Sequence, residues 1–331
     1  MAAGALSSAS SGPRKPRLAA LMVSAPLGLP CNILHNPVVK TMDRNSAFIY
    51  VDVKQNYRKQ SRMIVQSISA LAGSQFPRGE VWLCGAGPGD PELLTLRAVQ
   101  ALGQADLILH DSLPGRSALR HARRSAEVVA VGKRKGAAPV PQVKINARLI
   151  AGARAGLRVL RLKGGDPFTF GRGGEEALAC TAAGIPWRVI PGISAGMAAP
   201  AAAGIPITHR GMASAVTFVT AHDETGALPD LNWAALAQTG GTIAAFMAVS
   251  RLDELALRLL AGGLAPATPV AFISQASLPG QAVLRTTLGQ CTLEVRRAGL
   301  PTPAMIIIGA VADLGRSALT RTLEGLRHAH G

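Results

Sequence analysis

The chain has 331 residues, 48% of them hydrophobic, which is enough for two ordinary domains with buried cores and one additional segment. This composition excludes a chain that is disordered throughout, and an aromatic content of 4% argues against the stacked-base surfaces of proteins that bind single-stranded nucleic acid. The net charge of +16 suits an acidic partner, either a nucleic acid or a small polyanion, although a soluble basic surface explains it equally well.

Residues 1–78 differ in composition from the rest of the chain. They are rich in Ser, Arg and Pro and show no sustained hydrophobic period, and residues 1–79 carry half of the net charge. The basic residues 14–17 and the apolar run 18–29 loosely resemble a signal or transit segment, but Pro26 and Pro30 interrupt the run. We therefore expect residues 1–78 to be a poorly ordered basic extension, and we assign it no function.

Residues 79–207 alternate between apolar, strand-like runs and helical periods. This order predicts an α/β domain with a mostly parallel sheet that is covered by helices on both faces. Asp90 is suited to cap the first helix, since Pro91 follows it at the first helical position. The expected strands are 81–85, 105–110, 127–131, 158–162 and 187–190, and the expected helices are 91–102, 143–155, 174–183 and 194–203.

Residues 208–315 predict a second α/β domain, and residues 316–331 form a tail. The last two expected strands follow each other without room for a long helix, so we expect a mixed sheet. The expected strands are 215–220, 242–248, 269–274, 283–287 and 304–310, with helices at 233–238 and 251–261.

The most informative segment is residues 162–176, LKGGDPFTFGRGGEE. Six of its fifteen residues are Gly or Pro, and Gly in the interior of a regular element costs roughly 0.5–1 kcal/mol. The segment follows an apolar strand and precedes a helix, and the carboxyl ends of such strands are where open α/β sheets bind ligands. It predicts a pocket lined by backbone atoms.

Other familiar motifs are missing or incomplete. The string GAGPGDP at 85–91 has Asp90 in place of the third glycine of a dinucleotide fingerprint, so we reject a nicotinamide site. There is no phosphate-binding loop and no GxSxG elbow. Asp111, Lys133 and Asp166 each follow a predicted strand and could face one crevice, although charges at strand ends are also ordinary solvated residues.

The cysteines and histidines show no ligand spacing. Four scattered Cys without a CxxC pair favour core positions in a reducing compartment such as the cytoplasm, and seven His without an HExxH pattern predict no metal site. The long uncharged stretch 189–207 contains three Pro and three Gly, so we expect no membrane span there.

Five strings occur together in an order that points to one family. They are VWLCGAGPGDPELLTL, VGKRKG with Gln142 and Asn146 downstream, RLKGGDPFTFGRGGEE, VIPGISA and AGIPITHR. Over roughly residues 80–314 they resemble the uroporphyrinogen-III C-methyltransferase branch of the tetrapyrrole methylase family. Some members carry a fused dehydrogenase and ferrochelatase module, for which residues 1–78 are too short.

The resemblance implies two α/β domains with the active site in the cleft between them, and usually a homodimer. It implies S-adenosyl-L-methionine as methyl donor without a metal, and a small-molecule substrate rather than nucleic acid or a membrane. It further implies methylation of uroporphyrinogen III at C2 and C7 to give precorrin-2 for sirohaem or cobalamin biosynthesis.

Residue roles follow from the same resemblance. Asp111 corresponds to the proton acceptor and Lys133 to the proton donor. The residues expected to contact the cofactor are Pro88, Gly164, Gly165, Asp166, Thr169, Ser194, Ala195, Met247 and Ala276. Because the substrate carries eight carboxylates, we also expect a basic cleft, with Arg161, Lys163, Arg172, Lys133, Arg134 and Arg210 as contributors.

The chain departs from the family pattern at several places. His110 stands where a Tyr is common, Ala248 ends a YMG-like string, and Ser274-Gln-Ala-Ser277 replaces an ENGT-like segment. The segment VPQVKIN also has Val143 and Lys144 where acidic residues are usual. Three alternatives stay open: a later precorrin methyltransferase; an RNA-modifying or RNA-binding protein, which the positive charge would suit; and a homologue without catalytic activity, for which the altered segment 274–277 is the support.

Overall fold

The computed structural model describes residues 38–42, 48–52, 75–111, 115–132 and 140–314. The chain divides into two compact units, Met1–Ser67 and Ile68–Gly331. In the first unit, β1 (Val38–Met42) pairs antiparallel with β2 (Phe48–Asp52), although the sequence indicates no strand there. All other described elements belong to the second unit. In the described part of the chain, no helix is both long and apolar enough to span a membrane.

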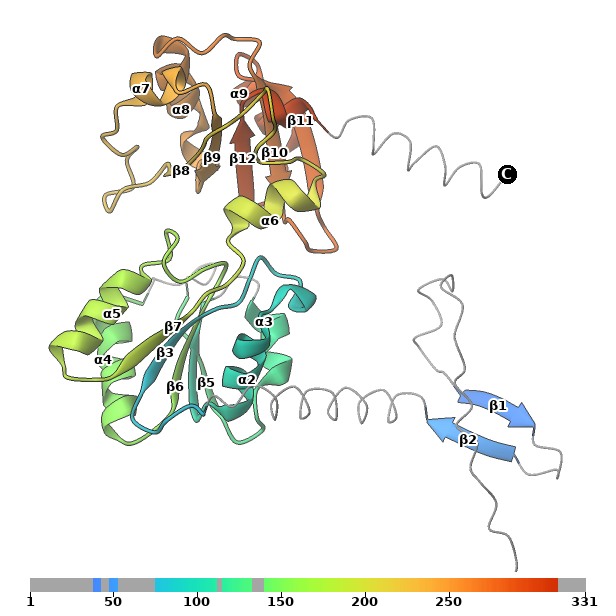
Figure 1. Cartoon of the computed structure of the whole chain (residues 1–331), viewed down its shortest axis with the longest axis vertical. Coiled ribbons are helices and arrows are strands. Elements are labelled where there is room, and N and C mark those ends of the chain that lie inside the picture. The colour runs from blue at the N-terminus through green and yellow to red at the C-terminus, as the bar shows by residue number, and fades with distance from the viewer. Residues whose placement is uncertain (1–37, 43–47, 53–74, 112–114, 133–139, 315–331) are drawn as a thin grey trace, which may run out of the picture. The chain divides into compact units, whose positions relative to one another are not determined.

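The first sheet of the second unit contains five parallel strands in the order β5-β4-β6-β3-β7. On one face, α2 packs its apolar side against the sheet, while α4 and α5 cover the other face (Figure 1). The bounds are Val81–Gly85 (β3), Leu96–Gln104 (α2), Leu107–His110 (β4), Gly115–Ala118 (α3), Glu127–Ala130 (β5), Gln142–Arg154 (α4), Val159–Lys163 (β6), Gly173–Ala182 (α5) and Trp187–Ile190 (β7).

The second sheet is mixed, in the order β11-β10-β12-β9-β8. Only β8 and β9 pair in parallel, and the other pairs are antiparallel. Helices α7, α8 and α9 pack on one face and α6 on the other (Figure 1). The bounds are Ala195–Ala202 (α6), Val216–Thr220 (β8), Trp233–Gln238 (α7), Thr242–Phe246 (β9), Leu252–Ala261 (α8), Pro269–Ser274 (β10), Ala282–Thr287 (β11), Cys291–Ala298 (α9) and Ala304–Ile308 (β12).

The predicted α/β architecture, with one parallel and one mixed sheet, is confirmed. Every strand predicted between residues 81 and 310 is present, with ends within two residues of the expected ones. Short 3-10 turns complete the fold at Pro91–Leu93 (η2), Leu119–His121 (η3), Val249–Arg251 (η4) and Ala310–Asp313 (η5).

Two helices differ from the prediction. The helix expected at 91–102 is split, because Asp90 caps only η2 and Leu94 returns to an extended conformation before Thr95 caps α2. The sequence also gave no reason to expect α9. Since β11 and β12 both pair antiparallel with β10, they run parallel to each other, and a crossover must join them. The eight residues of α9 make that crossover.

Phe76 lies within the predicted basic extension, yet it is a core residue. It is 1% exposed and stacks on Trp82 with 4.0 Å between the ring centroids. Its backbone is also engaged: the amide donates to Gln104 Oε1, and the carbonyl oxygen accepts from Arg158 Nε. The core of the first sheet therefore begins before residue 78.

A truncation tests this placement. We expect a chain that begins at Gln75 to keep the unfolding free energy of the full chain, since Phe76 stays in place. A chain that begins at Arg78 should lose about 3–5 kcal/mol, the usual cost of removing a large buried aromatic side chain. Urea unfolding followed by circular dichroism measures both. Equal stability of the two shortened chains would contradict a core role for Phe76.

Candidate active site

A cavity of about 890 Å³ lies at the carboxyl ends of β3, β4 and β6, and its opposite wall is formed by the loops that follow β9 and β10. Ten of the eleven residues that the sequence predicts for the site line this cavity. They are Pro88, Asp111, Gly164, Gly165, Asp166, Thr169, Ser194, Ala195, Met247 and Ala276. The eleventh, Lys133, lies outside the described residues. Residues from both sheets thus meet in one cavity.

Three glycines bring the end of β3 and the segments that follow β6 and β7 into direct contact beside the cavity. A Cβ on Gly85 would lie 2.5 Å from Gly192 Cα and 2.6 Å from the Gly165 oxygen, and a Cβ on Gly192 would overlap that same oxygen. Gly87 and Gly165 also exchange two backbone hydrogen bonds of 3.2 and 2.8 Å. At Gly85 and Gly192 only glycine fits, because any side chain would overlap the neighbouring backbone.

The side chain of Asp166 shapes the glycine-rich loop. Its Oδ1 accepts hydrogen bonds from the Phe168 amide at 2.9 Å and from Thr169 Oγ1 at 3.2 Å. Its Oδ2 accepts from the Gly192 amide at 3.1 Å, which ties this loop to the turn after β7. Both carboxylate oxygens are thus engaged by the protein, while the neighbouring glycines add backbone atoms to the cavity wall.

Ser194 has a structural contact in addition to its place on the cavity. Its Oγ accepts from the Gly196 amide at 3.4 Å and caps α6. The amino terminus of α6, including Ala195, therefore belongs to the cavity wall, while α6 itself packs on the second sheet.

Several residues with strained backbone conformations line the cavity. Among the described residues, five other than glycine have a positive φ, and four of them line the cavity: Phe170, Arg172, Met247 and Gln275. The fifth, Ser277, accepts a hydrogen bond from the Asp90 amide at 3.2 Å. Such conformations persist only where the surroundings impose them, and they cluster at ligand sites.

Met247 is the clearest case. A methionine at the end of a strand is usually a core residue, but this one is 49% exposed, has a φ of 54° and lines the cavity. Phe170, 41% exposed, meets Phe246 with ring centroids 4.9 Å apart, so aromatic rings from the two walls touch. These side chains give the cavity an apolar surface suited to a flat ring.

A buried group of charges lies behind the first wall. Arg161 donates from Nη2 to Asp111 Oδ1 at 2.5 Å and from Nε to Glu176 Oε1 at 2.8 Å. Lys163 Nζ donates to the same oxygen of Glu176 at 3.0 Å. The side chains of Arg161 and Lys163 are each 3% exposed and that of Glu176 is fully buried, whereas Asp111 keeps 30% of its side chain accessible.

The surroundings change the pKa of both buried cations. Burial alone would lower the pKa of Arg161, but the charges and hydrogen bonds of Asp111 and Glu176 outweigh it and raise the pKa of the guanidinium. Burial lowers the pKa of Lys163, and the positive charge of Arg161 lowers it further. Arg161 is thus a permanent cation that holds Asp111 by Oδ1. No described residue makes a hydrogen bond with Asp111 Oδ2.

The basic residues expected to bind substrate carboxylates differ in whether they line the cavity and in whether they are already paired. Arg161 and Lys163 line the cavity, but they already form ion pairs with Asp111 and Glu176 and so are not free to bind a substrate carboxylate. Arg172 also lines it and makes an exposed bidentate pair with Glu175 at 2.8 and 2.7 Å. Arg210 is not part of the cavity lining, and residue 134 lies outside the described residues.

Sequence reasoning missed the importance of Glu176. It lies in the GRGGEE string beside Glu175, and both are acidic residues in the first turn of α5. Only the helix orientation separates them, because Glu175 is exposed and Glu176 is fully buried. Neither the spacing nor the residue type carried that information.

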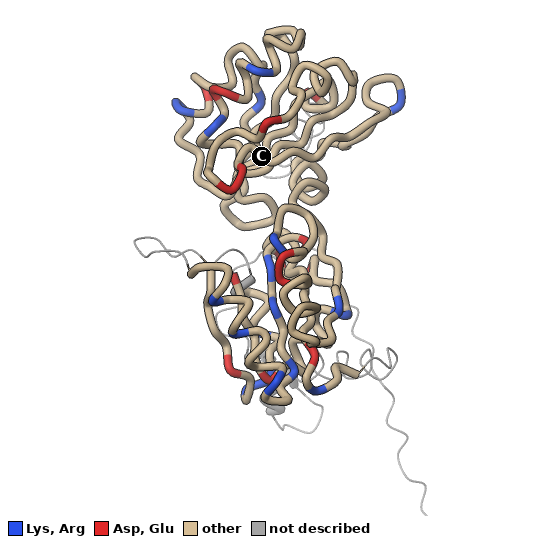
Figure 2. Tube along the Cα trace, turned by 90° about the vertical axis from the view of Figure 1, so that its left-hand side faces the viewer, with Lys and Arg blue, Asp and Glu red and all other residues tan. Residues whose placement is uncertain are grey.

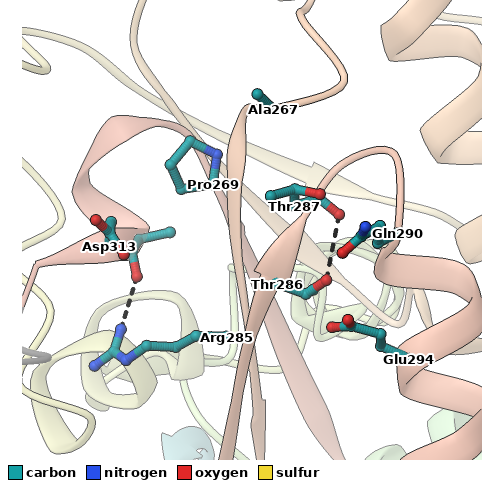
Figure 3. A pocket seen from close by; sticks show the side chains of 9 residues that line it. Ala267, Pro269, Arg285, Thr286, Thr287, Gln290, Glu294 and Asp313 are labelled. Atoms are coloured by element: carbon teal, nitrogen blue, oxygen red, sulfur yellow. Dashed lines mark hydrogen bonds between the residues drawn. The ribbon is translucent and has the colours of Figure 1, made fainter.

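A second hollow, of about 340 Å³, lies between β11, α9 and η5 (Figure 3). It shares no lining residue with the larger cavity. Its basic residue, Arg285, donates to the Ala312 oxygen at 2.7 Å and to the Ala203 oxygen at 3.2 Å. No residue expected for the site lies there.

Charge alone does not single out a binding face. Figure 2 shows Lys and Arg positions interleaved with Asp and Glu positions along the described chain. Among the described residues, no group of three or more His, Cys, Asp or Glu is arranged to hold a metal ion.

Comparison with known proteins gives a consistent result. Residues 80–292 match the family model for tetrapyrrole (corrin/porphyrin) methylases. A uroporphyrinogen-III C-methyltransferase of Sinorhizobium sp is 50% identical over 243 residues, which cover 73% of this chain and 86% of that protein. A siroheme synthase of Gluconacetobacter diazotrophicus is 48% identical, and the chain spans about half of its length (51%).

A solved structure is similar as well. The uroporphyrin-III C-methyl transferase from Thermus thermophilus, complexed with S-adenosyl homocysteine, aligns with a TM-score of 0.60 and 38% identity. The alignment covers 70% of this chain and 98% of that one.

The glycine contact beside the cavity can be tested by adding one methyl group. Gly192→Ala should lower the unfolding free energy by about 1–3 kcal/mol, since the methyl overlaps backbone atoms that cannot move aside. The matched control is Gly174→Ala, whose Cβ would meet no atom within 4 Å and which should be neutral or stabilising. Urea unfolding measures both, and an equal effect of the two substitutions would contradict the close packing.

Proposed function

The chain belongs to the tetrapyrrole methylase family, and from this premise we propose that it methylates uroporphyrinogen III at C2 and C7 and yields precorrin-2. It is an S-adenosylmethionine-dependent C-methyltransferase of tetrapyrrole biosynthesis. The observation that carries the finer proposal is the cavity, in which Asp111 from the first sheet lies with Met247 and Ala276 from the second. Sirohaem and cobalamin are both possible destinations of precorrin-2, and the siroheme synthase relatives favour the first.

The cavity fits S-adenosylmethionine. Its volume lies in the range of small-molecule sites, roughly 300–1,000 Å³. A purine needs an apolar surface, which Phe170 and Met247 offer. The amino-acid end needs backbone donors and acceptors, which Gly164 offers at the wall, since the amide and carbonyl of Gly165 already pair with Gly87. We propose that Pro88, Asp166, Thr169, Ser194, Ala195 and Ala276 complete this contact surface.

Methyl transfer requires little from the protein beyond positioning the methyl donor and the substrate. S-adenosylmethionine, when bound, supplies an electrophilic methyl group on a sulfonium sulfur. The new bond joins that methyl to an electron-rich ring carbon as the carbon–sulfur bond breaks, and the substrate then releases a proton. No protein nucleophile is required, so the chain holds the ring carbon in line with the methyl and accepts the proton.

Asp111 is suited to take that proton. Arg161 fixes its Oδ1, and its partly accessible carboxylate lines the cavity, so Oδ2, which has no donor among the described residues, is left to accept the proton. The proton donor proposed from the resemblance, Lys133, follows β5, the strand beside β4. The homodimer implied by the resemblance is part of the same proposal.

Arg172 is the best-placed cation for a substrate carboxylate. It lines the cavity, and its present partner Glu175 is exposed. Exposed ion pairs of this kind contribute about 0–1 kcal/mol, so a substrate carboxylate can replace Glu175 at small cost.

A direct assay tests the proposed function. The purified chain is incubated anaerobically with uroporphyrinogen III and S-adenosylmethionine, and the products are followed by absorbance and mass. We expect a mass gain of two methyl groups, with a singly methylated intermediate at early times. A product mass without any added methyl group would contradict the proposal.

A substitution tests the base. Asp111→Asn should lower kcat by about 100-fold or more, within the usual contribution of a general base, and leave the affinity for S-adenosylhomocysteine nearly unchanged. The matched control is Asp230→Asn, an exposed position outside the cavity lining, which should keep full turnover. If Asp111→Asn weakened the binding of S-adenosylhomocysteine without lowering kcat, the assignment of Asp111 as base would be wrong.

A further inference from the structure

Glu176 is fully buried and is not part of the cavity lining, yet it contacts the residues that are. Its Oε1 accepts three hydrogen bonds, from Arg161 Nε at 2.8 Å, Lys163 Nζ at 3.0 Å and Gln142 Nε2 at 3.1 Å. All three donors line the cavity. One oxygen behind the wall thus joins three side chains of the wall.

The local fold places Glu176 at this point. Arg161 and Lys163 are two residues apart on β6 and therefore point to the same face of the sheet. On that face lies α5, which begins directly after the glycine-rich loop. The loop closes by a hydrogen bond from the Gly173 amide to the Pro167 oxygen at 3.0 Å, and a Cβ on Gly173 would overlap that oxygen. This closure sets the first turn of α5, whose helix dipole favours the charge of Glu176.

The geometry of Arg161 links Glu176 to Asp111. The guanidinium is planar, with Nε held by Glu176 and Nη2 held by Asp111. The Nε bond, together with the bonds from Nη1 to the Leu162 oxygen at 3.1 Å and the Leu109 oxygen at 3.5 Å, fixes the rotation of the fork and so the position at which Nη2 meets Asp111 Oδ1. Glu176 also balances the second buried cation, Lys163, which would otherwise compete with Arg161 for Asp111.

Stability alone does not account for this cluster. Glu176 Oε2 is buried and has no hydrogen-bond partner among the described residues, which is an uncompensated cost. Buried ion clusters are often no more stable than apolar side chains of similar volume. A group kept at such a cost beside a cavity points to a part in the reaction.

We propose that Glu176 is a positioning residue for methyl transfer, which acts through Arg161 to hold Asp111 with Oδ2 free for the substrate proton. This inference rests on the proposed function. It predicts that the effect of changing Glu176 depends on Asp111 being present.

A double-mutant cycle tests this dependence. Glu176→Asp keeps the charge but withdraws the carboxylate by one methylene from its donors. We expect it to lower kcat at least tenfold in the wild-type background, with the KM for S-adenosylmethionine within about twofold. In the Asp111→Asn background the same change should alter kcat by less than about twofold, because residues that act as a unit are not additive. Glu254→Asp, in the first turn of α8, is the matched control and should leave kcat unchanged in both backgrounds.

The outcomes separate the two proposals. An active wild type with equal loss from Glu176→Asp in both backgrounds, or with no loss in either, overturns the positioning role alone. A wild type that adds no methyl group refutes the proposed function. Glu176→Gln, if it folds, should show a larger loss of kcat than Glu176→Asp and the same dependence on Asp111; if it does not fold, the Glu176→Asp cycle decides.

Discussion

The close approach of three backbones at Gly85, Gly165 and Gly192 is the constraint on which the site depends. It locks the end of β3 and the segments after β6 and β7 against one another without side chains between them. The carboxylate of Asp166 adds a bond to the same junction through the Gly192 amide. Because these segments cannot separate, the carboxyl edge of the parallel sheet offers a rigid wall of backbone atoms to a ligand.

The buried charges depend on that junction as well. The glycine-rich loop leaves the junction, closes on itself at Pro167 and delivers α5 with Glu176 facing β6. Arg161 and Lys163 then meet a carboxylate inside the protein, and Arg161 reaches on to Asp111 at the cavity. One side of this loop thus lines the cavity, and its end places α5 so that Glu176 completes the buried charge cluster.

Much of the fold and the site could be read from the sequence, for identifiable reasons. The strands are apolar runs bounded by Gly, Pro and charged residues, and the glycine-rich string follows one of them, so the strand ends and a pocket at that string were predictable from local pattern. Individual cavity residues such as Met247 and Ser194 were expected only from the family resemblance. The split at Leu94, the crossover α9 and the burial of Phe76 depend on pairing and packing between distant segments. Glu175 and Glu176 are neighbours of the same type, and only the orientation of α5 makes one of them a buried partner of Arg161.

An apolar, backbone-lined cavity and a partly accessible carboxylate held by a buried cation together form the proposed site. This cavity, and not the hollow at β11, is the one proposed to receive the methyl donor. A crystal structure of the chain with S-adenosylhomocysteine tests this placement most directly. We expect the ligand against Gly164, Gly165 and Met247, with Asp111 facing the same space. A ligand bound at β11, or a cavity without ligand at saturating concentration, would contradict it.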